Sequence, residues 1–310
     1  MRLVAAFLKL VRLPNLFFIA LAQALFQFCI YRPLFKGFIP ENDTQQFILI
    51  VLASLLIAAA GYIINDYFDI NIDEVNKPKD MVIDKMISRR WAIAWHFMLS
   101  TSGLILTVLA LPFFQKWYLI LINACSIALL WFYSTTFKRK LLIGNVVISL
   151  LTAWTVLILF YSKVSLMDAF GTENTTEHKF FRITFLYAGF AFISSLIREA
   201  VKDMEDLEGD EKYRCRTMPI VWGMNATKIY VAVWLAALIA ILVMVQIYVL
   251  QFRWWWPALY SVVLIILPLI YIFTKLFKAN SSRDFHLLSR WIKLVMLTGI
   301  LSMIFFYFYL

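Results

Sequence analysis

The chain has 310 residues, of which 63% are hydrophobic and only 15% are charged, and its mean hydropathy is +0.79. This composition excludes an ordinary soluble domain and is typical of a membrane protein that crosses the bilayer several times. The three Cys and three His residues stand far apart in the sequence, so they indicate neither a disulfide framework nor a zinc site.

Nine apolar stretches have roughly the length of 20 residues that spans a bilayer as a helix. The first is preceded by basic residues, as in a signal peptide. However, Arg12 and Pro14 interrupt it and no small-residue cleavage site follows, so we expect it to be retained. The gaps between the stretches are too short for a further domain, which predicts one all-α membrane domain over residues 1–310. The expected spans are 14–31, 46–65, 92–112, 117–136, 141–161, 180–198, 228–250, 255–275 and 290–310.

The distribution of basic residues predicts how these helices are oriented. If the N-terminus is cytoplasmic, 22 of the 29 Lys and Arg residues fall in cytoplasmic segments. Cytoplasmic loops carry such an excess in membrane proteins. We therefore expect an integral protein of the cell (inner) membrane with a cytoplasmic N-terminus. The net charge of +10 reflects this topology, and no nucleic-acid module or protein partner is indicated.

Two sets of three aspartates follow the second and sixth expected spans with the same spacing. The first triad is Asp66, Asp69 and Asp73, and the second triad is Asp203, Asp206 and Asp210. Offsets of three and seven residues place side chains along one face of a helix, so each triad is expected to extend its span as a helical stripe. Both spans end at the cytoplasmic side, so the two triads are expected to face each other there.

Grouped carboxylates repel one another unless cations are bound between them. Without Cys or His ligands nearby they favour Mg²⁺, which binds one or two carboxylates together with water and phosphate oxygens. The two triads thus predict Mg²⁺ ions around a diphosphate, with Arg198 and Lys202 as neighbouring cations. Either triad alone is equally compatible with a solvated helix. Charge at a membrane boundary is costly, however, so two equal triads on one side favour a ligand site.

At these residues the chain resembles the UbiA superfamily of intramembrane prenyltransferases. "NDYFDINID" (Asn65 to Asp73) is similar to the first signature of that family, and "KDMEDLEGD" (Lys202 to Asp210) is similar to the second. The stretches "FYSTTFKRKLLIGN" and "RTMPIVWG" most resemble the digeranylgeranylglyceryl phosphate synthase branch.

The resemblance implies a nine-helix bundle with an active-site cap on the cytoplasmic side. It also implies that Mg²⁺ bound by the six aspartates holds the diphosphate of a polyprenyl donor. The aromatic rings of Tyr62, Tyr67, Phe68 and Tyr133 would stabilise the allylic cation that forms when the diphosphate leaves. The expected substrate-binding residues are Asn65, Lys77, Tyr133, Lys138, Arg198 and Lys202.

The acceptor is indicated only by the branch of the family. Geranylgeranylglyceryl phosphate, or a similar glycerol-phosphate lipid, is the first hypothesis, and an aromatic acceptor such as 4-hydroxybenzoate, or a quinone or chlorophyll precursor, is the second. The basic segment Lys9 to Asn15 lies on the catalytic side and either meets an anionic acceptor or only signals topology. An ion-coupled transporter is less favoured, because transporters place ionisable groups near the bilayer midplane.

Overall fold

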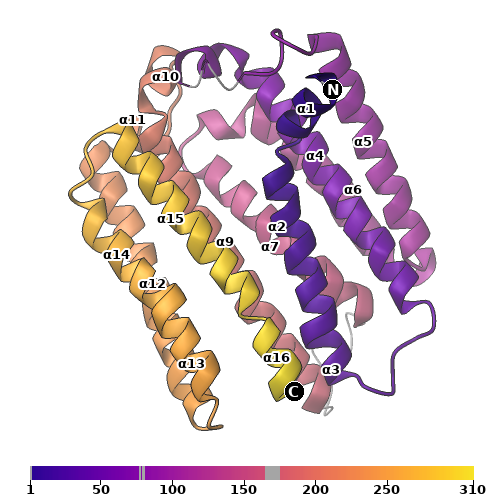
Figure 1. The fold of residues 1–310 in the computed structure, drawn as a ribbon. Coiled ribbons are helices and arrows are strands. Elements are labelled where there is room, and N and C mark those ends of the chain that lie inside the picture. Colours follow the sequence, from indigo (N-terminus) through magenta and orange to yellow (C-terminus); the bar gives the residue numbers. More distant parts are fainter. Residues whose placement is uncertain (1, 77, 79–80, 165–174) are drawn as a thin grey trace.

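The computed structural model describes residues 2–76, 78, 81–164 and 175–310. Within these ranges the chain forms helices and no strand, and nine helical segments are long and apolar enough to cross a membrane. The predicted all-α class and the predicted number of spans are therefore confirmed. The helices run alongside one another, and the two termini lie at opposite ends of the bundle, as an odd number of crossings requires (Figure 1).

Each spanning segment overlaps its predicted range. In chain order they are α2 (Leu13–Leu25) continued by η1 (Phe26–Tyr31) and α3 (Arg32–Leu34), α4 (Asp43–Asn76), α5 (Arg89–Ala110), α6 (Phe113–Thr135), α7 (Ile143–Lys163), α9 (Thr175–Glu205), α12 (Met224–Leu250), α13 (Trp255–Ser261) continued by η3 (Val262–Ile266) and α14 (Leu267–Leu276), and α15 (Ser282–Leu301) followed by α16 (Ile304–Tyr309). A short helix, α1 (Arg2–Leu10), precedes the first span, and three short helices lie between spans: η2 (Phe137–Arg139), α10 (Leu207–Lys212) and α11 (Met218–Val221).

The last span begins earlier than the hydropathy predicts. Its helix α15 starts at Ser282, well before residue 290, because Ser281 and Asp284 form a capping box. In this motif the Ser281 side chain accepts from the backbone of Asp284, and the Asp284 side chain accepts from the backbone of Ser281. The polar first turns of α15 therefore extend the bundle beyond its apolar part.

Helix α4 carries the whole first triad, as predicted. It continues for 34 residues, through the apolar span and then through the polar stretch that ends at Asn76. Between Gly61 and Pro78 the sequence contains neither glycine nor proline, so nothing interrupts the helical hydrogen bonds. The first triad therefore lies along one helix face at the end of this span.

The second triad does not lie on one continuous helix, so that expectation is wrong. Helix α9 ends at Glu205, Asp206 has a non-helical backbone (φ −93°, ψ 11°), and Asp210 belongs to α10. Asn76, the last residue of α4, stabilises this break. Its Nδ2 donates to the backbone oxygen of Asp206 (3.1 Å), and its Oδ1 accepts from the backbone nitrogen of Gly209 (2.9 Å).

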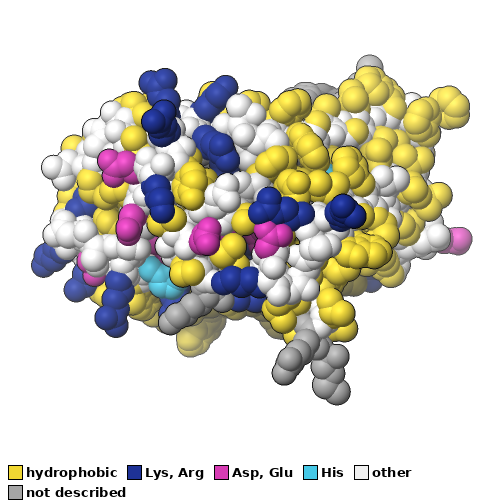
Figure 2. Space-filling model, turned by 90° about the horizontal axis from the view of Figure 1, so that it is seen from above, with side chains coloured by type: hydrophobic (Ala, Val, Ile, Leu, Met, Phe, Trp, Pro, Cys, Tyr) yellow, Lys and Arg dark blue, Asp and Glu magenta, His cyan; other side chains and the backbone are white. Residues whose placement is uncertain are grey.

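Apolar side chains pack around α4 at the end of the bundle that carries the triads. Helix α1 and the segment that leads into α5 pack on α4 through residues that include Leu10, Ile63, Val82 and Ile83. Seen from this end, Lys, Arg, Asp and Glu side chains gather over the left and centre of the face, and hydrophobic side chains predominate on its right (Figure 2). Along the bundle many large apolar side chains point outward, as lipid contact requires.

Candidate active site

One cavity of about 540 Å³ is lined by all six aspartates of the two triads. It lies at the charged end of the bundle, and residues of α2, α4, α7, α9 and α15 contribute to its wall. The other expected site residues that line it are Asn65, Tyr133, Lys138, Arg198 and Lys202. Lys77, which was also expected there, lies outside the described residues.

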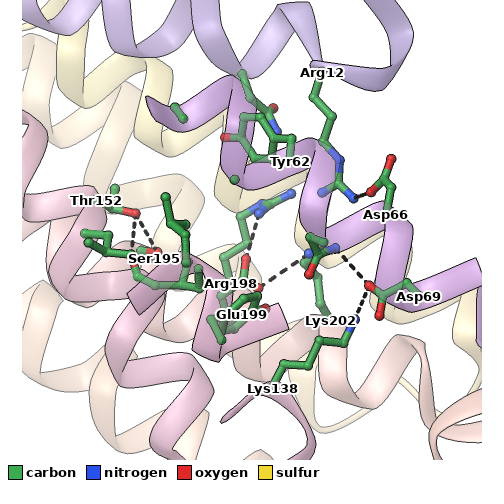
Figure 3. A pocket seen from close by; sticks show the side chains of 18 of the residues that line it. Arg12, Tyr62, Asp66, Asp69, Lys138, Thr152, Ser195, Arg198, Glu199 and Lys202 are labelled. Carbon is green, nitrogen blue, oxygen red and sulfur yellow. Dashed lines mark hydrogen bonds and ion pairs between the residues drawn. The ribbon is translucent and has the colours of Figure 1, made fainter. Parts of the chain in front are cut away.

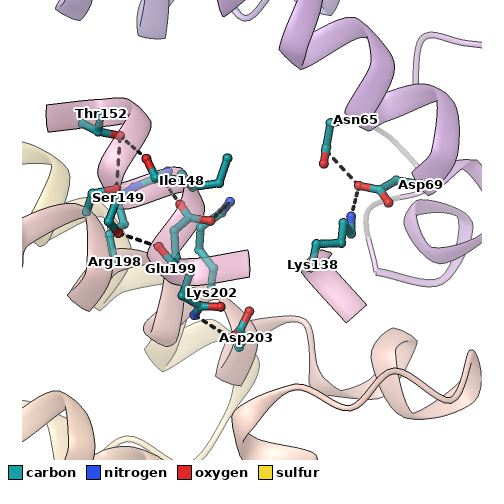
Figure 4. Close-up of polar contacts among 12 residues, drawn as sticks. Asn65, Asp69, Lys138, Ile148, Ser149, Thr152, Arg198, Glu199, Lys202 and Asp203 are labelled. Atoms are coloured by element: carbon teal, nitrogen blue, oxygen red, sulfur yellow. Dashed lines mark hydrogen bonds and ion pairs between the residues drawn. The ribbon is translucent and has the colours of Figure 1, made fainter. Parts of the chain in front are cut away.

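Asp69 occupies the centre of the first triad and is almost fully buried, with 4% of its surface exposed. Its Oδ2 forms an ion pair with Lys138 and accepts a hydrogen bond from Asn65 Nδ2 (2.8 Å; Figure 4). Asp69 Oδ1 and Asn65 Oδ1 are also buried, and neither has a partner among the described residues. Two buried oxygen acceptors are thus available beside the cavity.

Lys138 links the two triads electrostatically. Lys138 lies in η2, which packs closely against the start of α7. The glycine at position 144 permits this approach, since a Cβ there would lie only 2.8 Å from the Lys138 Cα. Burial opposes the charge of the Lys138 ammonium, but Asp69, Asp73 and Asp210 act on it strongly enough to raise its pKa above the ordinary value. Lys138 is therefore a fixed positive charge that interacts with aspartates of both triads.

The second triad faces the same volume. Asp203 accepts a hydrogen bond from Asn145 Nδ2 (2.8 Å). Burial raises the pKa of Asp210 to about 6; Lys138 opposes this rise, whereas Asp206 and Asp69 add to it. Because a carboxylate of the first triad acts on Asp210, the two triads share one electrostatic environment, as the sequence predicted.

The arrangement fits Mg²⁺ bound together with phosphate groups. Among the described residues, no three His, Cys, Asp or Glu side chains lie close enough to hold a metal ion by themselves. Mg²⁺ does not need such a cage, because it commonly takes one or two carboxylates with water and phosphate oxygens. The carboxylates of the triads and the buried acceptor oxygens of Asp69 and Asn65 are ligands of this kind.

Sequence reasoning missed several polar residues of the site. Arg12 belongs to the segment Lys9 to Asn15, which was expected either to meet an anionic acceptor or only to signal topology, and its contact with an aspartate was not foreseen. It has a left-handed backbone between α1 and α2, and its Nη2 pairs with Asp66 Oδ1 (2.5 Å; Figure 3). Glu199 accepts from Arg198 (3.0 Å) and Lys202 (3.4 Å). The spacing of Glu199 from Lys202 could have indicated that pair, but no local pattern connects Arg12 with a residue 54 positions away.

The expected aromatic set is only partly present at the cavity. Tyr62 and Tyr133 are among its lining residues, whereas Tyr67 and Phe68 are not. The Phe68 ring packs instead against Trp131, with the ring centroids 5.7 Å apart. The expectation that Tyr67 and Phe68 face the cavity is therefore wrong, because successive residues of α4 point to different sides of the helix.

The contact between Asn76 and Gly209 gives a testable prediction. A Cβ on Gly209 would lie 2.5 Å from the Asn76 side-chain nitrogen and oxygen, so Gly209→Ala must displace that side chain. We expect Gly209→Ala and Asn76→Ala each to lower turnover by about 10- to 100-fold, the range found when residues that orient metal ligands are lost.

The double variant tests whether the two residues act together. If both changes release the same turn, the double variant is expected to be no slower than the slower single variant. Initial rates at several Mg²⁺ concentrations measure this effect. If the fold losses in turnover of the two single variants multiply in the double variant, the two residues act independently, and the Asn76 contact does not position the second triad.

Fold and site together define an integral, multi-pass membrane protein with a charged active-site cavity at one end of its helical bundle. Residues 34–297 match the UbiA prenyltransferase family. The match covers most of the chain, so the chain belongs to this family and is a prenyltransferase.

Named relatives and solved structures agree with this assignment. The chain is 27% identical to the digeranylgeranylglyceryl phosphate synthase of Methanosphaera stadtmanae, over 87% of this chain and 90% of that one. It is 31% identical to the enzyme of the same name from Methanothermobacter thermautotrophicus, over 72% of each chain.

Two structural likenesses support the fold. A structure from work on digeranylgeranylglyceryl phosphate synthase in membranes has a TM-score of 0.65 and 24% identity, and the match covers 98% of this chain and 99% of that one. A UbiA homolog from Archaeoglobus fulgidus bound to GPP and Mg²⁺ has a TM-score of 0.56 and 14% identity, over 96% of this chain and 99% of that one.

Proposed function

We propose that this single-domain protein is a Mg²⁺-dependent prenyltransferase that transfers a polyprenyl group to a glycerol-phosphate lipid. The donor is the diphosphate of the prenyl group, which we take to be geranylgeranyl. The names of the relatives suggest geranylgeranylglyceryl phosphate as the acceptor. The observation that carries the proposal is the shared cavity, where aspartates of both triads act on Lys138.

The aspartates of both triads would hold Mg²⁺, with the Asn65 amide oxygen beside Asp69. Bound there, Mg²⁺ supplies Lewis-acid stabilisation of the negative charge that develops on the leaving diphosphate. Lys138 and Lys202, which also line the cavity, add fixed positive charge. Because Lys138 is held by Asp69, the negative charge of the diphosphate has a pre-oriented partner.

The bond changes follow from this arrangement. The bond between the prenyl C1 and the diphosphate oxygen breaks, and the diphosphate takes the electron pair. The allylic cation that remains is stabilised by the rings of Tyr62 and Tyr133, both of which line the cavity. An acceptor hydroxyl oxygen then bonds to C1, and its proton passes to the departing diphosphate, so no protein base is required.

We also propose that the charged end of the bundle faces the cytoplasm. The excess of Lys and Arg in the segments on that side supports this orientation. A thiol reagent that cannot cross membranes would test it. A cysteine placed at Arg139, an exposed residue of η2, is expected to react only after cells are opened, and labelling of intact cells would overturn the orientation.

A product assay tests the proposed reaction. Purified protein, labelled geranylgeranyl diphosphate and Mg²⁺ would be incubated with geranylgeranylglyceryl phosphate or with 4-hydroxybenzoate. We expect a labelled diether lipid from the first acceptor. A labelled product from the aromatic acceptor alone would show that the acceptor assignment is wrong.

A further inference from the structure

One part of the cavity wall forms a basic corner. It is formed where α2, α9 and α15 contribute Asn15, Arg198 and Lys293 to the lining. Helices α2 and α15 pack against each other and carry none of the six aspartates. The corner therefore belongs to the same cavity but has different chemistry from the triads.

Lys293 is partly buried and is held inside the cavity wall. Its Nζ donates to Asn15 Oδ1 (2.7 Å) and lies 5.2 Å from the centroid of the Phe18 ring. The charged groups that act on it are Arg198, Arg12 and Lys202, all of them cations. Among the described residues it is paired with no carboxylate. Partly buried cations that lie this close together repel one another unless an anion binds between them.

Arg198 has donor capacity beyond its protein partner. Its Nη1 donates to Glu199, which also accepts from Lys202. Its Nε is buried and has no hydrogen-bond partner among the described residues. A guanidinium with an unused N–H group can donate to a phosphate oxygen, and its planar set of donors matches the geometry of a phosphate group.

We propose that Asn15, Arg198 and Lys293 form a second anion site, which binds the phosphate monoester of the acceptor lipid. This inference rests on the proposed function and deepens it. It assigns Arg198, expected from the sequence to bind the diphosphate, to the acceptor instead. A phosphate monoester carries a charge of about −1.5 to −2 at neutral pH, which the cations of this corner can neutralise.

Contacts through Tyr62 connect this site with the first triad. The Asn15 side chain is hydrogen-bonded to the Tyr62 hydroxyl, the Arg12 guanidinium lies 5.3 Å from the centroid of the Tyr62 ring, and Arg12 pairs with Asp66. Tyr62 thus contacts Asn15 of this site and Arg12, which is the partner of Asp66 in the first triad. We therefore expect the Tyr62 ring to lie near the point where the prenyl carbon and the acceptor hydroxyl meet.

Kinetics of Lys293→Met test the site. We expect the KM for geranylgeranylglyceryl phosphate to rise by about 10- to 100-fold, the loss typical of a hydrogen bond to a charged group. The KM for geranylgeranyl diphosphate is expected to stay the same. The preference for this acceptor over the same lipid without its phosphate is expected to disappear. Lys293→Arg, which keeps the charge, is expected to recover part of the loss.

Lys228→Met is a matched control. Lys228 also donates to an asparagine side chain, Asn280 (3.2 Å), and lies 5.8 Å from the centroid of the Phe285 ring, but it does not line the cavity. This variant is expected to leave both KM values unchanged. Equal losses in the two Met variants, or an unchanged acceptor KM in Lys293→Met, would overturn the proposal.

A binding measurement separates this inference from the proposed function. Dodecyl phosphate, titrated without Mg²⁺ or prenyl diphosphate, is expected to bind the wild type and the Lys138→Met variant equally, and the Lys293→Met variant at least about tenfold more weakly. If this pattern appears but the wild type makes no diether lipid, the acceptor assignment fails and the anion site stands. If diether lipid forms but Lys293→Met binds dodecyl phosphate like the wild type, the anion site fails alone.

Discussion

Replacing Asp69 by Asn is expected to lower prenyl transfer by about 1,000-fold or more, the scale seen when one preorganised electrostatic group is lost from an active site. Asp69 is buried and pairs with Lys138, and one of its carboxylate oxygens has no partner in the part of the chain that the structure describes. The amide keeps the shape of the side chain but removes its charge. It therefore weakens metal binding and leaves Lys138 without its counter-ion.

Turnover of purified protein, with thermal unfolding as a check on folding, measures this effect. Asp84→Asn is a suitable control, since Asp84 also pairs with a cation, Arg89 (2.6 Å), but lies outside the cavity lining. We expect the control to keep wild-type turnover. An Asp69→Asn protein that retained most of its turnover would show that the first triad does not bind the reacting groups.

Removing divalent cations with EDTA is expected to abolish turnover, and adding Mg²⁺ is expected to restore it fully. The carboxylates of the triads repel one another and the diphosphate, so the prenyl donor cannot bind productively without bridging cations. Because the described residues hold no cluster of three metal-binding side chains, Mg²⁺ is expected to bind tightly only together with a diphosphate.

Thermal unfolding can measure this dependence. Mg²⁺ alone and inorganic diphosphate alone are each expected to raise the unfolding temperature slightly, and the two together much more, since ligands stabilise the folded state that binds them. Helical circular dichroism controls for loss of the fold after chelation. Full turnover in EDTA would contradict the proposed role of the metal.

Much of the fold follows from local features of the sequence. Apolar length determines the spanning helices, because every backbone polar group in lipid must be satisfied within the helix. The uninterrupted stretch from Gly61 to Asn76 likewise determines that the first triad extends α4. Spacing alone misled for the second triad, because it assumes a continuous helix, whereas Asn76 stabilises a break at Asp206.

The sequence by itself determined the class of protein, the number of crossings and the two acidic triads, since each depends on composition or on spacing within one segment. Only the tertiary structure decided which side chains contact the individual aspartates of those triads. Arg12 reaches Asp66, Lys138 reaches Asp69 and Asn145 reaches Asp203 from helices that are distant in the chain. Such contacts depend on how helices pack in three dimensions, and no periodicity within a single segment records them.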